Sequence, residues 1–165
     1  VLHRLQSMLY LDIQGKGSRR RCKRVIEWFK AKYMPKHHLD ITVVHRGLKR
    51  EGAVGFCTVM DCDHRPREFL IEMETTLSED LYCQTLLHEL WHVYQHVIGT
   101  LRDKRGVRYW KNIDSDHLSY QDQPWEQEAQ QMEIKLYNCY LGLGPKSHGT
   151  GTPFPNRLTK SKIPV

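Results

Sequence analysis

The segment 86–94 constrains this chain more than any other, because it places two histidines and a glutamate on an apolar helix. Residues four apart lie on one face of a helix, so His88 and His92 can direct two imidazoles at one ion, with Glu89 beside them. Apolar residues cover most of the remaining helix surface: Leu86, Leu87, Leu90, Trp91, Val93, Tyr94, Val97 and Ile98. Such a helix is expected to be buried on most sides. Burying two imidazoles and a carboxylate is costly unless they pair with one another or bind a metal, so the sequence predicts a metal site.

The pattern His-Glu-x-x-His at His88, Glu89 and His92 resembles that of the zincin metallopeptidases. The resemblance implies that the two histidines bind zinc and that Glu89 serves as the general base. Because the chain has ten His, a random order of its residues would contain the pattern in roughly a few sequences per hundred. The apolar surroundings strengthen the resemblance. The alternative interpretation is a core helix whose histidines are satisfied by hydrogen bonds.

Two histidines do not complete a catalytic zinc site, which usually has three protein ligands and one water. The candidates for the third ligand are His96, His117, Glu126 and Glu128. His96 lies two turns beyond His88, too far along the helix axis to close a tetrahedral site with both motif histidines. We therefore expect His96 behind the ligands or at the surface, whereas His117 remains a competitor in an irregular stretch.

A second amphipathic helix after residue 123 favours a carboxylate ligand. Glu126 and Glu128 lie about equally far to either side of its apolar stripe, so helix geometry does not choose between them. The segment resembles the gluzincins, in which a second helix offers a glutamate ligand, and in one large branch an Ala follows three positions later, as Ala129 does here. The resemblance implies Glu126 as the third ligand. Gln130 stands where that branch has Asp, so support for a histidine is expected from another residue such as Glu133.

A histidine as the third ligand would point to a different family. With His117 in that place, the chain would resemble the SprT-like proteases, which act on DNA-bound proteins. A basic cluster at 16–24 suits this alternative, because Lys and Arg attract phosphates. The cluster consists of Lys16, Arg19, Arg20, Arg21, Lys23 and Arg24, in a chain with a net charge of +6. A solvated helix face is the simpler explanation, since no recognisable nucleic-acid-binding motif accompanies the cluster.

The expected function is that of a zinc-dependent metallopeptidase that hydrolyses peptide bonds in peptide or protein substrates. By the resemblance, His88, His92 and Glu126 hold Zn²⁺, which activates a water, and Glu89 takes the proton of that water. A metal-binding module without peptidase activity is the alternative. Both proteins would bind zinc, but only the enzyme needs Glu89.

An oxyanion forming beside zinc calls for a further hydrogen-bond donor. Tyr120, Tyr109 and His117 are the candidates between the two helices, and Tyr120 is preferred. The resemblance also implies that a substrate strand pairs with an edge strand of the sheet. We expect 68–74 to be that edge, with its carboxylates guarding against aggregation.

Hydrophobic periodicity predicts an α+β, zincin-like fold: a small antiparallel or mixed sheet packed on an N-terminal helix and the motif helix, followed by the glutamate-bearing helix. One domain is expected over 1–144 and a flexible tail over 145–165, in which His148 could reach a metal. Helices are predicted within 1–14, over 18–34 and 78–98 and from Pro124 to about 141, strands over 40–46, 53–60 and 68–74, and a hairpin of 107–110 with 117–120.

No apolar run approaches the roughly 20 residues that span a bilayer, and no charged and then apolar leader opens the chain. The sequence therefore predicts a soluble protein without a membrane partner. Its five Cys have no spacing typical of a disulfide framework, so we expect free thiols and a cytoplasmic location.

Overall fold

The computed structural model describes residues 8–62 and 64–143. The tail expected at 145–165, with His148, lies outside these residues. The elements in chain order are β1 (Leu9–Gly15), α1 (Arg19–Tyr33), β2 (Leu39–His45), the 3-10 helix η1 (Lys49–Glu51), β3 (Gly55–Val59), β4 (Glu68–Met73), α2 (Glu79–Ile98), β5 (Leu101–Lys104), β6 (Val107–Trp110), β7 (Ile113–Asp114), the 3-10 helix η2 (Tyr120–Asp122) and α3 (Pro124–Tyr140).

Four strands form a mixed sheet in the order β1-β2-β4-β3. β1, β2 and β4 run parallel to one another, whereas β3 returns antiparallel to β4. Every second residue of β2 is buried, from Leu39 to His45, which is the pattern of a strand with one face on the core. The described residues therefore form an α+β fold with a small mixed sheet and three α-helices, as the periodicity of the sequence predicts.

The first described segment is a strand, so the prediction of a helix within 1–14 is wrong for residues 9–14. These residues belong to β1, which pairs with β2 along its whole length. Leu9, Leu11 and Ile13 alternate along β1 and pack on the core. In so short a segment the apolar spacing fits a helix and a strand equally well, and pairing with the neighbouring strand β2 decided the outcome.

The expectation that 68–74 forms the edge strand is also wrong. β4 lies inside the sheet, with β2 on one side and β3 on the other. β1 and β3 are the edge strands of the described sheet, because β3 folds back onto the side of β4 that β2 leaves open. A period of two identifies a strand but carries no information about its neighbours, so the order could not be read from the sequence.

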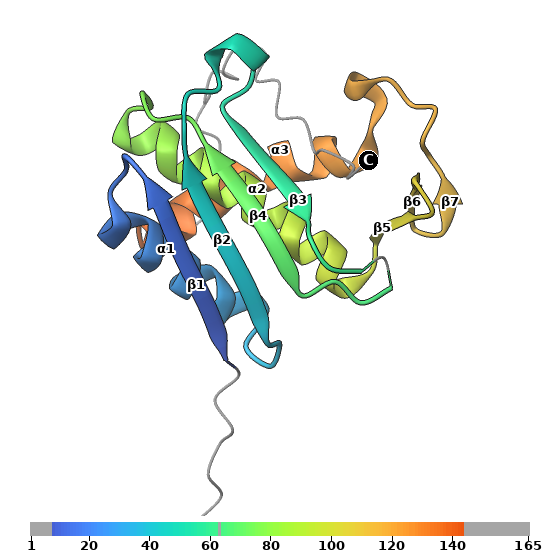
Figure 1. The fold of residues 1–165 in the computed structure, drawn as a ribbon, viewed down its shortest axis with the longest axis horizontal. Helices are drawn as coiled ribbons and strands as arrows, with labels where there is room; N and C mark the ends of the chain where they lie inside the picture. The colour runs from blue at the N-terminus through green and yellow to red at the C-terminus, as the bar shows by residue number, and fades with distance from the viewer. Residues whose placement is uncertain (1–7, 63, 144–165) are drawn as a thin grey trace, which may run out of the picture.

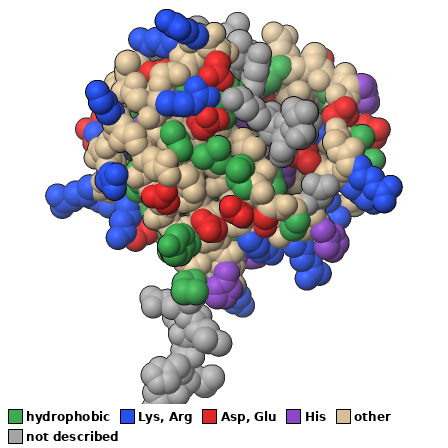
Figure 2. Space-filling view, viewed as in Figure 1, with side chains coloured by type: hydrophobic (Ala, Val, Ile, Leu, Met, Phe, Trp, Pro, Cys, Tyr) green, Lys and Arg blue, Asp and Glu red, His purple; other side chains and the backbone are tan. Residues whose placement is uncertain are grey.

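The three α-helices lie behind the sheet, and α2 contacts α1, α3, β3, β4 and β5 (Figure 1). Figure 2 shows the opposite face of the sheet, where green hydrophobic side chains are bordered by red carboxylates. The main core lies between the sheet and the helices and includes Phe29, Ile41, Phe69, Leu86 and Leu90, all fully buried. This arrangement makes α2 the central helix of the molecule.

The bounds of α2 agree with the sequence prediction. Ser78 caps its first turn by accepting a hydrogen bond from the backbone N–H of Leu81, and Gly99 ends it in the left-handed conformation that favours glycine. Between Tyr82 and Val97, every residue except Gln84 and Tyr94 is buried. No described helix is both long and apolar enough to cross a lipid bilayer.

A second, three-stranded sheet with the order β5-β6-β7 follows α2. The strand predicted at 107–110 is confirmed, but its expected partner at 117–120 is wrong, because these residues lead into η2. Instead, β6 pairs with β5 across a two-residue turn in which Arg105 and Gly106 both have positive φ. Such turns match the twist of hairpin strands, but Arg is an unusual residue for that conformation and gave no signal in the sequence.

Candidate metal centre

Three buried side chains converge between α2 and α3. His88 and His92 come from one face of α2, and Glu126 comes from the first turn of α3. Their exposed fractions are 2%, 1% and 1%. His88 Nε2 lies 3.2 Å from His92 Nε2 and 3.4 Å from Glu126 Oε2, and His92 Nε2 lies 3.3 Å from Glu126 Oε1. The three residues form a group that could hold a metal ion.

The three residues bring their donor atoms close enough to share one ion. With one ligand atom from each residue, these atoms lie within 4.8 Å of one another, and the two imidazole nitrogens lie close to the separation of about 3.3 Å expected between neighbouring ligands of a small tetrahedral cation. Glu126 faces the two histidines with different oxygens, Oε2 toward His88 and Oε1 toward His92. Its carboxylate therefore spans both imidazoles.

The charges of the site favour a cation at its centre. Burial opposes a charge on His88, but hydrogen bonds with Glu126 and Glu133 outweigh it and raise the His88 pKa to about 10. Burial also opposes a charge on Glu126, yet the charge of His92 and the hydrogen bonds of both histidines hold its pKa well below the usual range. The Glu126 carboxylate is therefore negatively charged at neutral pH and favours a positive charge beside it.

A carboxylate supports His88 from behind. Glu133 Oε2 lies 3.0 Å from His88 Nδ1, so an Nδ1–H can donate to it and leave Nε2 directed at the centre. The sequence indicated Glu133 for this role because Gln130 replaces the expected Asp. Gln130 is exposed on the same helix, so the supporting carboxylate comes from one turn further along α3.

Glu128, the other carboxylate candidate, does not join the group. Its Oε2 accepts hydrogen bonds from Trp91 Nε1 at 2.9 Å and from Gln95 Nε2 at 2.7 Å. Gln95 Oε1 in turn lies 2.8 Å from His92 Nδ1. Helix geometry alone left the two carboxylates equivalent, but the structure separates them. Glu126 faces His92 directly, whereas Glu128 is connected to His92 only through Gln95.

The two histidine candidates lie elsewhere. His117 is exposed and does not belong to the group. His96 is not a surface residue, because it is 4% exposed and burial lowers its pKa to about 3. It packs near Phe69 of β4, with 6.3 Å between ring centroids. His96 is therefore a neutral core histidine.

Glu89 lies beside the group with one oxygen unsatisfied. The residue is 1% exposed, and burial raises the pKa of its carboxyl to about 7. Its buried Oε1 has no hydrogen-bond partner among the described residues. A buried polar atom without a partner is costly in a folded protein, and Glu126 Oε1, in the same group, also has no hydrogen-bond partner among the described residues.

A glycine on β3 makes room for that carboxylate. A Cβ added to Gly55 would lie 2.6 Å from Glu89 Oε1 and 3.0 Å from Thr85 Cγ2. Only a residue without a side chain lets the edge strand pass so close to Glu89. The edge of the sheet and the carboxylate therefore border the same space.

Tyr120 reaches the group from η2. Its hydroxyl donates to Glu126 Oε2 at 3.1 Å, and the side chain is partly exposed. Tyr109 lies on β6 and is also partly exposed. The residue preferred from the sequence is thus the one that contacts a member of the group.

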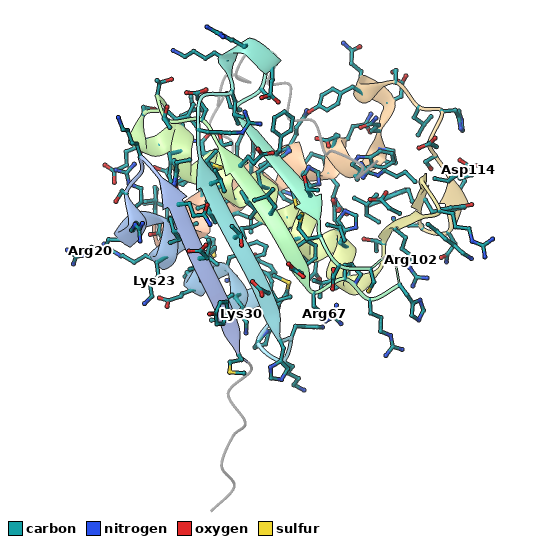
Figure 3. All side chains as sticks on the ribbon, viewed as in Figure 1. Arg20, Lys23, Lys30, Arg67, Arg102 and Asp114 are labelled. Atoms are coloured by element: carbon teal, nitrogen blue, oxygen red, sulfur yellow. The ribbon has the colours of Figure 1, made fainter. Side chains whose placement is uncertain are left out.

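The remaining polar clusters lie outside this centre. Arg20 and Lys23 extend outward from α1 (Figure 3), and Arg21 Nε pairs with Glu79 Oε1 at 3.5 Å. The binding of nucleic acid by residues 16–24 stays a prediction. All five cysteines are free thiols: Cys22, Cys57 and Cys83 are buried, and Cys62 and Cys139 are exposed.

Sequence reasoning missed Gln95 and Gly55. Gln95 is a fully buried amide on an apolar helix, and a polar residue in such a setting already calls for a partner. Gly55 lies inside a strand pattern, where glycine often marks a close approach of another group.

Comparison with protein-family models, with curated proteins and with solved structures finds no match for this chain.

Proposed function

We propose that this chain is a zinc metallopeptidase with a gluzincin-like centre on a zincin-like fold. The observation that carries the proposal is the convergence of His88, His92 and Glu126 beside Glu89, whose buried Oε1 has no hydrogen-bond partner among the described residues. Two histidines and one glutamate as ligands, with a further carboxylate beside them, are typical of a hydrolytic zinc site.

Zinc is the metal that the donors favour. Two imidazoles and one carboxylate suit Zn²⁺, whereas Mg²⁺ and Ca²⁺ prefer oxygen ligands in larger number. His88, His92 and Glu126 would hold the ion. When bound, zinc supplies a Lewis acid that polarises a carbonyl and lowers the pKa of water toward ~7.

Glu89 is suited to move the proton. Its pKa of about 7, raised by burial, is close to neutral pH, where a general base both accepts and returns a proton efficiently. Its Oε1 is free to accept a proton from the attacking water. The same carboxyl then passes this proton to the leaving amine of the cleaved peptide.

Tyr120 and β3 complete the proposed site. Tyr120 OH, next to Glu126, would donate to the carbonyl oxygen as negative charge develops there. β3 is an edge strand and carries Gly55 against Glu89. A substrate strand that pairs with this edge would bring its peptide bond past the carboxylate.

The test is the substitution Glu89→Gln, assayed for zinc content and for cleavage of a mixed peptide library. We expect zinc to be retained and turnover to fall by about 10²–10⁴-fold, the contribution of a general base. Glu79→Gln is the matched control, because the same change at the exposed start of α2 leaves the site intact. If the parent binds zinc but cleaves nothing, the chain is a metal-binding module and the proposal fails.

A further inference from the structure

A chain of hydrogen bonds runs behind His92, on the side away from the three ligands. His92 Nδ1 lies 2.8 Å from Gln95 Oε1. Gln95 Nε2 donates to the carbonyl oxygen of Trp125 at 3.1 Å and to Glu128 Oε2 at 2.7 Å. Glu128 Oε2 also accepts from Trp91 Nε1 at 2.9 Å. Gln95 is fully buried, whereas Glu128 at the end of the chain of hydrogen bonds is partly exposed.

The acceptors around Gln95 decide which way its amide faces. An amide has one end that donates and one that accepts. The Trp125 carbonyl and the Glu128 carboxylate both accept, so they hold the NH₂ group and leave Oε1 facing His92. An oxygen opposite Nδ1 requires a proton on Nδ1, and a neutral imidazole then has its lone pair on Nε2.

We propose that Glu128 is a positioning residue that acts through Gln95 to fix the His92 tautomer competent to bind zinc. The inference rests on the zinc site of the proposed function but does not depend on peptidase activity. Without Glu128, the Gln95 amide can turn its NH₂ group toward Nδ1. This would place the imidazole proton on Nε2, where it blocks the metal.

The relay also ties the ligand to the docking of α3. Glu128 follows Glu126 by two residues on the first turns of α3, and Trp91 and Gln95 are one turn apart on α2. Trp91 and Gln95 thus both donate hydrogen bonds to Glu128 from α2, while Glu126 faces His92. The contact between α2 and α3 therefore positions Glu126 and also sets the orientation of the His92 ring.

The first test measures zinc affinity by competition with a chelator. We expect Glu128→Ala and Gln95→Met each to weaken zinc binding by about 10–100-fold, as changes behind a ligating histidine do. Gln130→Ala, an exposed change on the same helix, is the control and should bind as the parent does. Glu128→Gln should also retain affinity, because its amide oxygen can accept from both Trp91 and Gln95. An equal loss in Glu128→Gln would show that charge alone matters and would overturn the relay.

The second test is a double-mutant cycle. If Glu128 acts through Gln95, then Glu128→Ala weakens zinc binding in the parent but not in a Gln95→Met background. Equal losses in both backgrounds would overturn the proposal, since a general effect on folding acts in either. Urea unfolding of the metal-free variants reports that effect separately. Zinc affinities as expected, with no cleavage by the parent or by any variant, would count against the peptidase proposal alone.

Discussion

At the scale of single residues, the closest fit in the site is that of Gly55 against Glu89. We expect Gly55→Ala to lower kcat/KM for peptide cleavage by about 10²-fold, because a shift of the base by a fraction of an ångström misplaces it. The added Cβ would lie 2.6 Å from Glu89 Oε1, so the carboxylate must move. Zinc affinity should stay near that of the parent, since no ligand is touched.

Gly47→Ala is the control for this change, because a Cβ at Gly47 meets nothing within 4 Å. Chelator competition and peptide cleavage, measured on both variants, separate metal binding from catalysis. Unchanged cleavage in Gly55→Ala would show that Glu89 is not held against β3 during turnover.

The residues of the site differ in how far the sequence could predict them. His88, Glu89 and His92 follow from spacing on one helix, because an α-helix fixes their relative positions whatever the rest of the fold does. Glu126 could be predicted as the third ligand only from the resemblance to the gluzincins, because helix geometry places Glu128 equally well for that role. The role of Gln95 depends on the Trp125 carbonyl from another helix, and no local pattern records such a contact.

At the scale of elements, the β5–β6 hairpin supports the start of α3. Arg108 on β6 donates to Asp103 on β5 through Nε at 2.7 Å and Nη2 at 2.8 Å, and both side chains are largely buried. The Arg108 guanidinium also lies 5.5 Å from the ring centroid of Trp125, the residue before Glu126. The hairpin therefore contacts the turn of helix that presents the third ligand.

Asp103→Asn should lower the free energy of unfolding by about 3 kcal/mol, because it removes the negative charge that pairs with the buried Arg108 guanidinium. Urea denaturation of the metal-free protein measures the loss. Asp114→Asn, at an exposed position of β7 (Figure 3), is the control. The double variant Asp103→Leu/Arg108→Met removes both charges and should recover most of the stability lost in Asp103→Asn. A loss in the double variant as large as that in Asp103→Asn would show that the charge of Arg108 without its Asp103 partner is not the cause.

Among the elements, helix and strand positions were predictable but neighbours were not. The helices 18–34 and 78–98 carry their own caps in the sequence, and α1 and α2 begin and end where those caps place them. The order of strands depends on partners that are distant in the chain. For this reason β4 was expected at an edge of the sheet. The position of β1 is the exception among the elements, because its short apolar spacing fits a helix as well as a strand.

At the scale of the whole molecule, His96 links folding to pH. Burial lowers its pKa from 6.5 to about 3. At a pH between these two values, His96 therefore binds a proton in the unfolded chain but not in the folded chain. Stability that is present above pH 6.5 is therefore lost as the pH falls, by about 1.4 kcal/mol per pH unit.

Between pH 7 and pH 5, the metal-free parent should lose about 2 kcal/mol more stability than His96→Gln, which has no titrating group at this position. Urea denaturation at both pH values gives the two differences. His117→Gln, at an exposed site, should lose as much as the parent. Equal losses of stability in the parent and in His96→Gln would show that His96 binds a proton as readily in the folded chain as in the unfolded chain.

The placement of the three ligands on two helices has a consequence for the energetics of the fold. His88 and His92 come together as soon as α2 forms, but Glu126 joins them only after β5, β6 and β7 have turned the chain back and α3 has docked. An ion that needs all three ligands binds the complete domain and not its parts. If the group binds such an ion, the concentration of free metal enters the folding equilibrium and adds about 4 kcal/mol of stability at a thousand times Kd. Metal supply would act on the lifetime of this protein as well as on its chemistry.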